Sequence, residues 1–163
     1  MGVADYLRAQ ELPLYGSTVS DVDTARLTSA ISGGTALQAY AHVLLSFRLC
    51  GMPFVLAEDD DLSGVGAELQ WLTPDQIISE ALEVYPGILV TKLGFIPVGM
   101  CLMGSGDYYY INAKSSDPFD PPLVRIPFDG VTSKTTYAEE MIEPVSKSLT
   151  DFFKAAVMEP QPV

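Results

Sequence analysis

The sequence has few of the residues on which much catalytic and structural chemistry depends. Its 163 residues include two cysteines, one histidine and 9 Lys+Arg. Cys50 and Cys101 lie far apart among apolar neighbours and form no C-x-x-C pair, which excludes a disulfide scaffold and a typical cysteine metal site. We expect both to be free, buried thiols in a reducing compartment.

Positive charge is scarce, and the formal net charge is −12 because 21 Asp+Glu stand against 9 Lys+Arg. A field of that sign repels a phosphate backbone, so direct binding of nucleic acid is not expected. The same field attracts a basic protein and steers it toward a complex. The alternative explanation is that the acidity only keeps the protein in solution.

Long apolar runs are missing as well. Gly, Pro and Asp interrupt the longest apolar stretch, so no segment reaches the length of a membrane span. The N-terminus lacks the basic region and apolar run of a secretory signal, and Tyr6 stands where a myristoylation signal has Ser or Thr. We therefore expect a cytoplasmic protein that does not enter a membrane.

The length and a hydrophobic fraction of 48% suit one globular domain with a proper core. The chain has no internal repeat and no linker. We expect a single domain over residues 1–163. It would comprise an N-terminal helical extension over 1–35, a core over 36–156 and a frayed tail over 160–163.

Three segments carry helix signals. Ser20 and an acidic third residue predict a helix start, with the helix ending near 33–34. Apolar residues recur at helical spacing over 35–51, where Gly51 is the predicted stop. Thr73, followed by Pro, Asp and Gln, marks the clearest helix start, and the Pro-Gly pair at 86–87 is predicted to end that helix.

The remaining segments predict strands and a last helix. Strand patterns cover 53–57 and 67–71, and a run of strands with turn punctuation follows from residue 88 to residue 128. Val145, Leu149, Phe152, Phe153 and Ala156 are predicted to line one face of a C-terminal helix. The order of elements predicts an α+β fold, with an antiparallel-rich mixed sheet of about five to six strands covered by helices.

The stretch MGSGDYYYIN, residues 103–112, resembles a catalytic or ligand-binding loop at first sight. A nucleophile elbow needs glycines two positions before and after the serine, where Met103 and Asp107 stand. The only histidine, His42, falls in the middle of a predicted helix, and a dinucleotide loop would need a third glycine where Tyr109 stands. We therefore predict no catalytic residue and no cofactor. We expect a β-hairpin around Ser105, whose tyrosine strand is central in the sheet.

Four consecutive carboxylates, Glu58, Asp59, Asp60 and Asp61, form the other conspicuous cluster. Such a run offers hard oxygen ligands to Ca²⁺ or Mg²⁺, although it lacks the alternating ligands of an EF-hand. We expect a solvated loop without a bound metal, and it is our candidate contact for a protein partner. A small metal-dependent hydrolase that uses these carboxylates is the alternative from a different class.

Several motifs of the chain form a pattern together: Gly104 to Asp107, Tyr108 to Ile111, Val124 to Phe128, Leu149 to Phe153, Tyr40, Gly51, Trp71 and the helix start at Thr73. This pattern resembles the SUKH superfamily, the group around the fungal Smi/Knr-type cell-wall synthesis regulator. The similarity covers most of 36–156 and is strongest over 92–156. Two positions depart from the family pattern: the usual Pro before the helix that bears Tyr40 is replaced by the Ala-Leu-Gln of 36–38, and the Asn-Gly pair by the Cys-Gly of 50–51.

This resemblance implies a Smi/Knr-like α+β fold and a function in binding, not in catalysis. Many bacterial members look like immunity proteins that neutralise a partner toxin, often a nuclease, and others are regulatory or scaffold interaction proteins. We accordingly expect a protein partner, with a basic toxin domain as the candidate, and a chain that is a monomer or a weak dimer.

Overall fold

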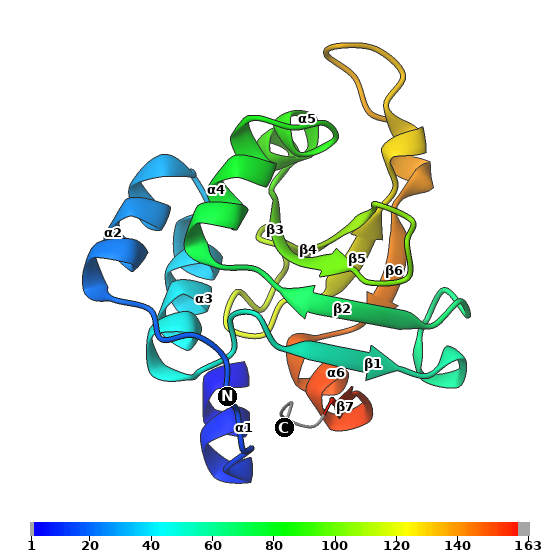
Figure 1. The fold of residues 1–163 in the computed structure, drawn as a ribbon. Coiled ribbons are helices and arrows are strands. Elements are labelled where there is room, and N and C mark those ends of the chain that lie inside the picture. The colour runs from blue at the N-terminus through cyan, green and yellow to red at the C-terminus, as the bar shows by residue number, and fades with distance from the viewer. Residues whose placement is uncertain (1, 160–163) are drawn as a thin grey trace.

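The computed structural model describes residues 2–159, which form an α+β domain around one sheet of seven strands (Figure 1). The strands are β1 (Pro53–Leu56), β2 (Ala67–Trp71), β3 (Phe95–Cys101), β4 (Tyr108–Asn112), β5 (Leu123–Ile126), β6 (Glu143–Ser146) and β7 (Val157–Met158). The helices are α1 (Val3–Gln10), α2 (Asp21–Ala30), α3 (Gly34–Ser46), α4 (Pro74–Leu82), α5 (Gly87–Val90) and α6 (Leu149–Ala155). Four short 3-10 turns are η1 (Glu58–Asp60), η2 (Thr91–Leu93), η3 (Phe128–Gly130) and η4 (Glu139–Met141).

The capping residues place two helix starts where the sequence predicts them. Asp23 N donates to Ser20 Oγ at 3.2 Å ahead of α2, and the Asp23 carboxylate accepts from Ser20 N. Thr73 and Gln76 make the same reciprocal pair at the start of α4, at 3.3 and 2.9 Å. Each pair satisfies backbone N–H groups that a helix leaves without partners in its first turn.

Other predicted boundaries are wrong. Helix α3 ends at Ser46 instead of continuing to Gly51, because Phe47 already has extended backbone, and Gly51 lies in a later turn with φ of +85°. Helix α4 ends at Leu82, before the Pro-Gly pair, and the apolar run after that pair forms α5 and η2 before β3 begins. Val145 lies in strand β6, so the C-terminal helix starts later, at Leu149.

The predicted hairpin around Ser105 is confirmed. Strands β3 and β4 pair antiparallel, with Met100 opposite Tyr108, and the turn between them uses Gly104 and Gly106 at φ of +86° and +77°. Those values suit glycine and few other residues. The sheet has more strands than predicted because β6 and β7 were not recognised, and all its pairs among the described residues are antiparallel, not mixed.

The sheet is curled. Its strand order is β6-β5-β4-β3-β2-β1-β7, so β1 and β6 are separated by four strands. The connection between β1 and β2 nevertheless reaches β6, where Leu62 N donates to Val145 O at 3.0 Å. Such a contact between distant strands requires strong curvature, which follows from the natural twist of strands and from the bulges in β3–β4 and β5–β6.

Side chains cover both faces of the sheet. Tyr109 and Ile111 point into the large core, while Tyr110 joins a smaller cluster under α5 with Val90 and Phe95. At the centre of the large core lies an aromatic group from β1, β2 and α6, in which Trp71 and Phe153 stack at 5.3 Å between ring centroids. The group comprises Phe54, Trp71, Phe152 and Phe153.

One carboxyl group is buried near Tyr110, which belongs to the smaller cluster under α5. Glu80 of α4 is 7% exposed. Burial raises the pKa of Glu80 from its ordinary value to about 7. Its charge in turn helps to raise the pKa values of Tyr108 and Tyr110, after the larger effect of their own burial. The folded protein therefore favours a neutral Glu80, whereas the unfolded chain ionises it near pH 4.5.

We predict that Glu80 makes the protein less stable as the pH rises from about 4.5 to about 7, because the folded state holds a proton that the unfolded state has lost. Glu80→Gln removes this titration. It should stabilise the protein by about 1 to 2 kcal/mol at pH 8 relative to its effect at pH 4.5. Urea denaturation at both pH values measures the difference. Glu83→Gln, at an exposed position, is the control, and equal behaviour of the two variants would contradict the prediction.

Candidate functional site

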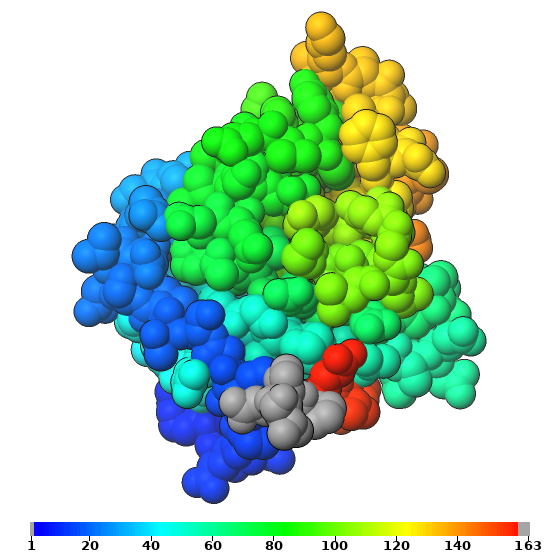
Figure 2. All heavy atoms as spheres, viewed as in Figure 1, coloured from blue at the N-terminus to red at the C-terminus, as the bar shows by residue number. Residues whose placement is uncertain are grey.

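Three connections lie at the same end of the sheet. In an antiparallel sheet, the end of β1, β3 and β5 meets the start of β2, β4 and β6, so the segments that join them share one edge. They are residues 57–66, 102–107 and 127–143, counting the first residue of β6, and we call them the loop end. Figures 1 and 2 show them on one side of the molecule, with the arm of residues 128–142 projecting farthest.

The loop end carries much of the negative charge of the chain. It holds nine of the 21 acidic residues but a single basic one, Lys134. The opposite ends of the strands, by contrast, lie next to Arg48, Lys92, Lys114 and Lys147 in the sequence. The charge of −12 is thus distributed unevenly. The acidic residues of the loop end are Glu58, Asp59, Asp60, Asp61, Asp107, Asp129, Glu139, Glu140 and Glu143.

The structure separates the four predicted contact residues into two groups. Glu58, Asp59 and Asp60 form η1 and are exposed, as a contact surface requires. Asp61 turns inward, and its side chain is 0% exposed. Asp61 therefore stabilises the loop from inside and offers nothing to a partner.

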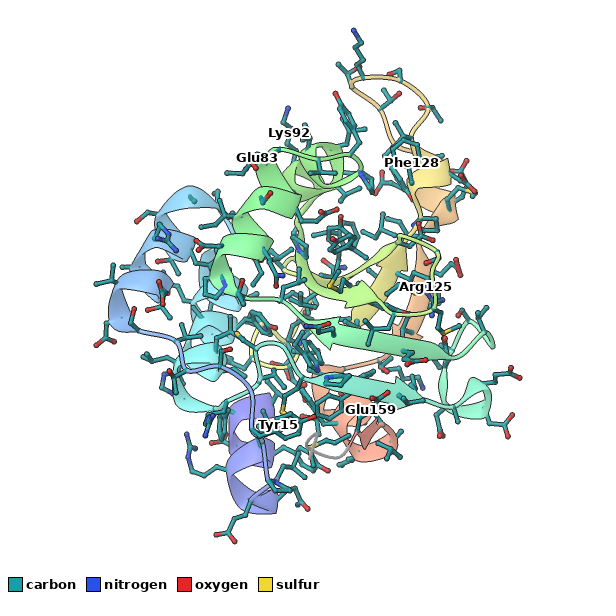
Figure 3. The ribbon with its side chains drawn as sticks, viewed as in Figure 1. Tyr15, Glu83, Lys92, Arg125, Phe128 and Glu159 are labelled. Atoms are coloured by element: carbon teal, nitrogen blue, oxygen red, sulfur yellow. The ribbon has the colours of Figure 1, made fainter. Side chains whose placement is uncertain are left out.

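Asp61 turns inward because it pairs with Arg125 of β5, whose side chain is 7% exposed. Arg125 Nη2 donates to Asp61 Oδ2 at 3.1 Å and to the carbonyl oxygen of Gly66 at 2.8 Å. Arg125 Nη1 donates to Ser63 Oγ at 3.1 Å and to Glu143 Oε2 at 3.3 Å. We call this set, with Tyr109, the Arg125 clasp; Figure 3 labels Arg125.

Tyr109 completes the clasp. Its hydroxyl oxygen accepts from Arg125 Nε at 3.3 Å, and the guanidinium carbon lies 5.0 Å from the centre of its ring. Burial raises the pKa of Tyr109 to about 12, so the phenol stays neutral. Burial also opposes the charge of Arg125, but its bonds to Tyr109 and Asp61 outweigh that effect and raise its pKa. The guanidinium is therefore charged at every ordinary pH.

Sequence reasoning missed Arg125, although a signal was present. The residue interrupts the otherwise apolar strand LVRIPF, where a charge is costly unless a partner satisfies it. That signal marks the arginine, but it does not say which of the 21 acidic residues pairs with it. Asp61 lies 64 positions away in the sequence, and only the curl of the sheet brings the two together.

Side chains of the GSGD turn, residues 104–107, make hydrogen bonds that hold the turn in place. Ser105 Oγ accepts from Asp107 N at 3.1 Å, and Asp107 Oδ1 accepts from Phe128 N at 3.2 Å, which ties the turn to the base of the arm. His42 lies on α3 with Nε2 3.3 Å from Ser46 Oγ. His42 lines a hollow of about 640 Å³ beside α1, and Ser105 is not among the residues that line this hollow. The structure thus places Ser105 and His42 in separate sites and pairs neither with the other.

The structure also bears on the predictions for the two cysteines, a metal site and a membrane span. Cys50 and Cys101 are free, with Cys50 buried and Cys101 partly exposed. Within residues 2–159, no group of three or more His, Cys, Asp or Glu side chains is arranged to hold a metal ion. No helix in that range has the length and apolar character to cross a bilayer. The predicted frayed tail at 160–163 lies outside the described residues.

Comparison with known proteins adds no relative. No family model matches the chain, and neither the curated proteins nor the solved structures include a significant match. The resemblance to the SUKH superfamily therefore stays a prediction.

We predict that Arg125→Met destabilises the protein by about 3 to 5 kcal/mol, because it leaves Asp61 charged, buried and without its partner. Asp61→Leu combined with Arg125→Met should cost clearly less than the sum of the two single changes. Urea denaturation measures all three variants. Asp59→Asn, at an exposed neighbour in η1, should stay within about 0.5 kcal/mol of the wild type. Equal stability of Arg125→Met and Asp59→Asn would contradict a structural role for the clasp.

Proposed function

We propose that this protein is a non-catalytic binding module that recognises a basic protein partner through the loop end. The role that we propose is that of a cytoplasmic immunity protein that neutralises a toxin of the nuclease type. The observation that carries the proposal is the one-sided charge of the loop end, with nine acidic residues and one basic residue. The resemblance to the SUKH superfamily supports it and names the class of partner.

The charge distribution favours a specific interface over general solubility. Acidity that only kept the protein in solution would serve as well if it were spread over the surface. Concentrated at one end, it attracts a basic surface and orients the encounter. Carboxylates held against the basic cleft of a nuclease would occupy the place of the substrate phosphates, which explains how binding alone would inhibit the enzyme.

Exposed apolar side chains accompany the charge. Protein interfaces combine a few buried apolar anchors with a polar rim. The loop end supplies both kinds of residue, since the connections that carry its acidic residues also carry large apolar side chains that are more than a third exposed. These are Leu62, Val65, Leu102, Met103, Phe128 and Met141.

The same family resemblance supports a second hypothesis, in which the protein is a regulatory or scaffold interaction protein. It shares the binding surface and differs in the partner, which would be a regulated enzyme or assembly and not a toxin. The hypothesis from a different functional class is a small metal-dependent hydrolase. It would have to rely on Glu58, Asp59 and Asp60, because Asp61 is committed to Arg125.

We predict that the protein captures a basic partner from a lysate of its source organism, and that recovery falls between 0.01 and 0.1 M salt as the Debye length shortens from about 30 to about 10 Å. Replacing Glu58, Asp59 and Asp60 by Gln, Asn and Asn should reduce recovery several-fold. If the partner is a nuclease toxin, adding the wild-type protein should abolish its cleavage of nucleic acid. If it is a regulated protein, capture occurs without such inhibition.

The matched control removes three exposed charges elsewhere, with Glu11, Asp21 and Glu83 replaced by Gln, Asn and Gln. It has the same net charge as the test variant, so a loss of binding in the test variant alone assigns recognition to the loop end. Equal recovery with both variants, or capture of neutral and acidic partners without salt dependence, would contradict the proposal.

We predict that Ca²⁺, Mg²⁺ and Mn²⁺ leave the melting temperature unchanged, because η1 offers three exposed side chains and no enclosed set of ligands. Thermal denaturation with and without each ion measures this. Asp59→Asn combined with Asp60→Asn is the appropriate variant, since changing Asp61 would disturb the clasp. A stabilisation of several degrees that this variant abolishes would favour the hydrolase reading instead.

A further inference from the structure

A groove of about 400 Å³ lies within the loop end, between the β3–β4 turn and the start of β6. Tyr109 and Arg125 line it and are buried, whereas Val65 and Met103 line it and are 52% and 53% exposed. The groove therefore has a polar interior and apolar sides. Its remaining lining residues are Gly66, Cys101, Gly104, Ser105, Asp107 and Glu143.

Arg125 does not make the groove a site for an anion. A guanidinium has five N–H donors. Those of Arg125 are engaged by Asp61, Ser63, Gly66, Tyr109 and Glu143. A phosphate or carboxylate that entered the groove would find this arginine already committed.

The carboxylates of the groove, in contrast, retain free acceptors. Asp107 Oδ1 accepts from Phe128 N at 3.2 Å, and Glu143 Oε2 accepts from Arg125 Nη1 at 3.3 Å. The second oxygen of each carboxylate accepts no hydrogen bond from any residue between 2 and 159. Arg125 forms ion pairs with both Asp61 and Glu143, so its one positive charge faces the negative charges of Asp61, Glu143 and Asp107, and the groove keeps an excess of negative charge.

The sides of the groove suit a long aliphatic chain with a charged tip. Lysine and arginine pack their methylene groups on apolar surface and keep the cation at a polar site. Val65 and Met103 provide that apolar surface at the rim. Phe128 N donates to Asp107 Oδ1 and so fixes that carboxylate at the groove, while the side chain of Phe128 does not line it.

We propose that this groove receives a lysine or arginine side chain of the partner protein, with its stem against Val65 and Met103 and its cation at Asp107 and Glu143. The inference rests on the proposed function and adds the anchor point of the interface. It separates two roles within the loop end. The carboxylates of η1 attract the partner at a distance, and the groove holds one of its basic side chains.

Short capped tripeptides, Ala-Lys-Ala and Ala-Arg-Ala, test the groove without the natural partner. Each is titrated into the ¹⁵N-labelled full-length protein at 0.15 M salt, and backbone amide shifts are followed by NMR. We expect saturable shifts at Gly66 and over residues 103–107. The peptide with norleucine in the central position keeps the four-carbon stem of lysine but lacks the ammonium group, so it should bind about tenfold more weakly.

Asp107→Asn is the decisive variant, since an asparagine oxygen still accepts from Phe128 N while the charge is lost. It should weaken binding of the basic tripeptides several-fold. Asp59→Asn, which removes the same charge outside the groove, should leave it unchanged. Equal effects of the two variants, equal binding of the norleucine peptide, or shifts centred on 58–60 would overturn the groove proposal.

The outcome is distinguishable from that of the proposed function. Charge-dependent capture of a basic partner without tripeptide binding would overturn the groove and leave the loop end as the interface. Tripeptide binding without any basic partner in the capture experiment would support the groove and overturn the role of the loop end in recognising a basic protein.

Discussion

The ion pair between Arg125 and Asp61 is the interaction on which the arrangement of the loop end depends. Burying two charges is expensive, and the attraction between them offsets that cost only when additional hydrogen bonds satisfy the remaining donors and acceptors. Here Tyr109, Ser63 and the Gly66 carbonyl meet that requirement. The pair joins the β1–β2 connection to β5, and Leu62 then bonds to β6. These contacts link the β1–β2 connection to β5 and β6 across the curled sheet.

The same pair determines which carboxylates face the solvent. With Asp61 held inside, the backbone of η1 is oriented so that Glu58, Asp59 and Asp60 project outward. The acidic surface is therefore presented on a connection anchored at its far side and not on a free loop. A surface that is ordered before binding loses less conformational entropy in the complex. The buried carboxylate of Asp61 thus holds the connection in the conformation that exposes the other three carboxylates.

How much the sequence predicts depends on how local each feature is. The starts of α2 and α4 and the β3–β4 hairpin were predicted correctly because caps and glycine turns act over a few residues. Strands β6 and β7 were missed because they are short, and Val145 fits both a strand and a helical face. Helix α5 was missed because an apolar run has no period that separates a buried helix from a strand. The inward orientation of Asp61 could not be predicted, because four consecutive acidic residues look equivalent in the sequence. Only the curled sheet brings Arg125 close to one of them.

In the proposed function, two physical effects at the loop end contribute differently to recognition. Exposed charges act over roughly a Debye length, about 8 Å at physiological salt, and chiefly raise the rate of association. They are poor at holding a partner, because water and salt screen each contact. Dissociation is slowed by desolvated contacts at the centre of an interface. In this protein the groove beside Val65 and Met103 combines apolar surface with the partly buried carboxylates of Asp107 and Glu143. An acidic rim around such a groove attracts many basic proteins but retains only those whose shape brings a basic side chain into it, and this restriction is what distinguishes a specific binding module from a merely acidic surface.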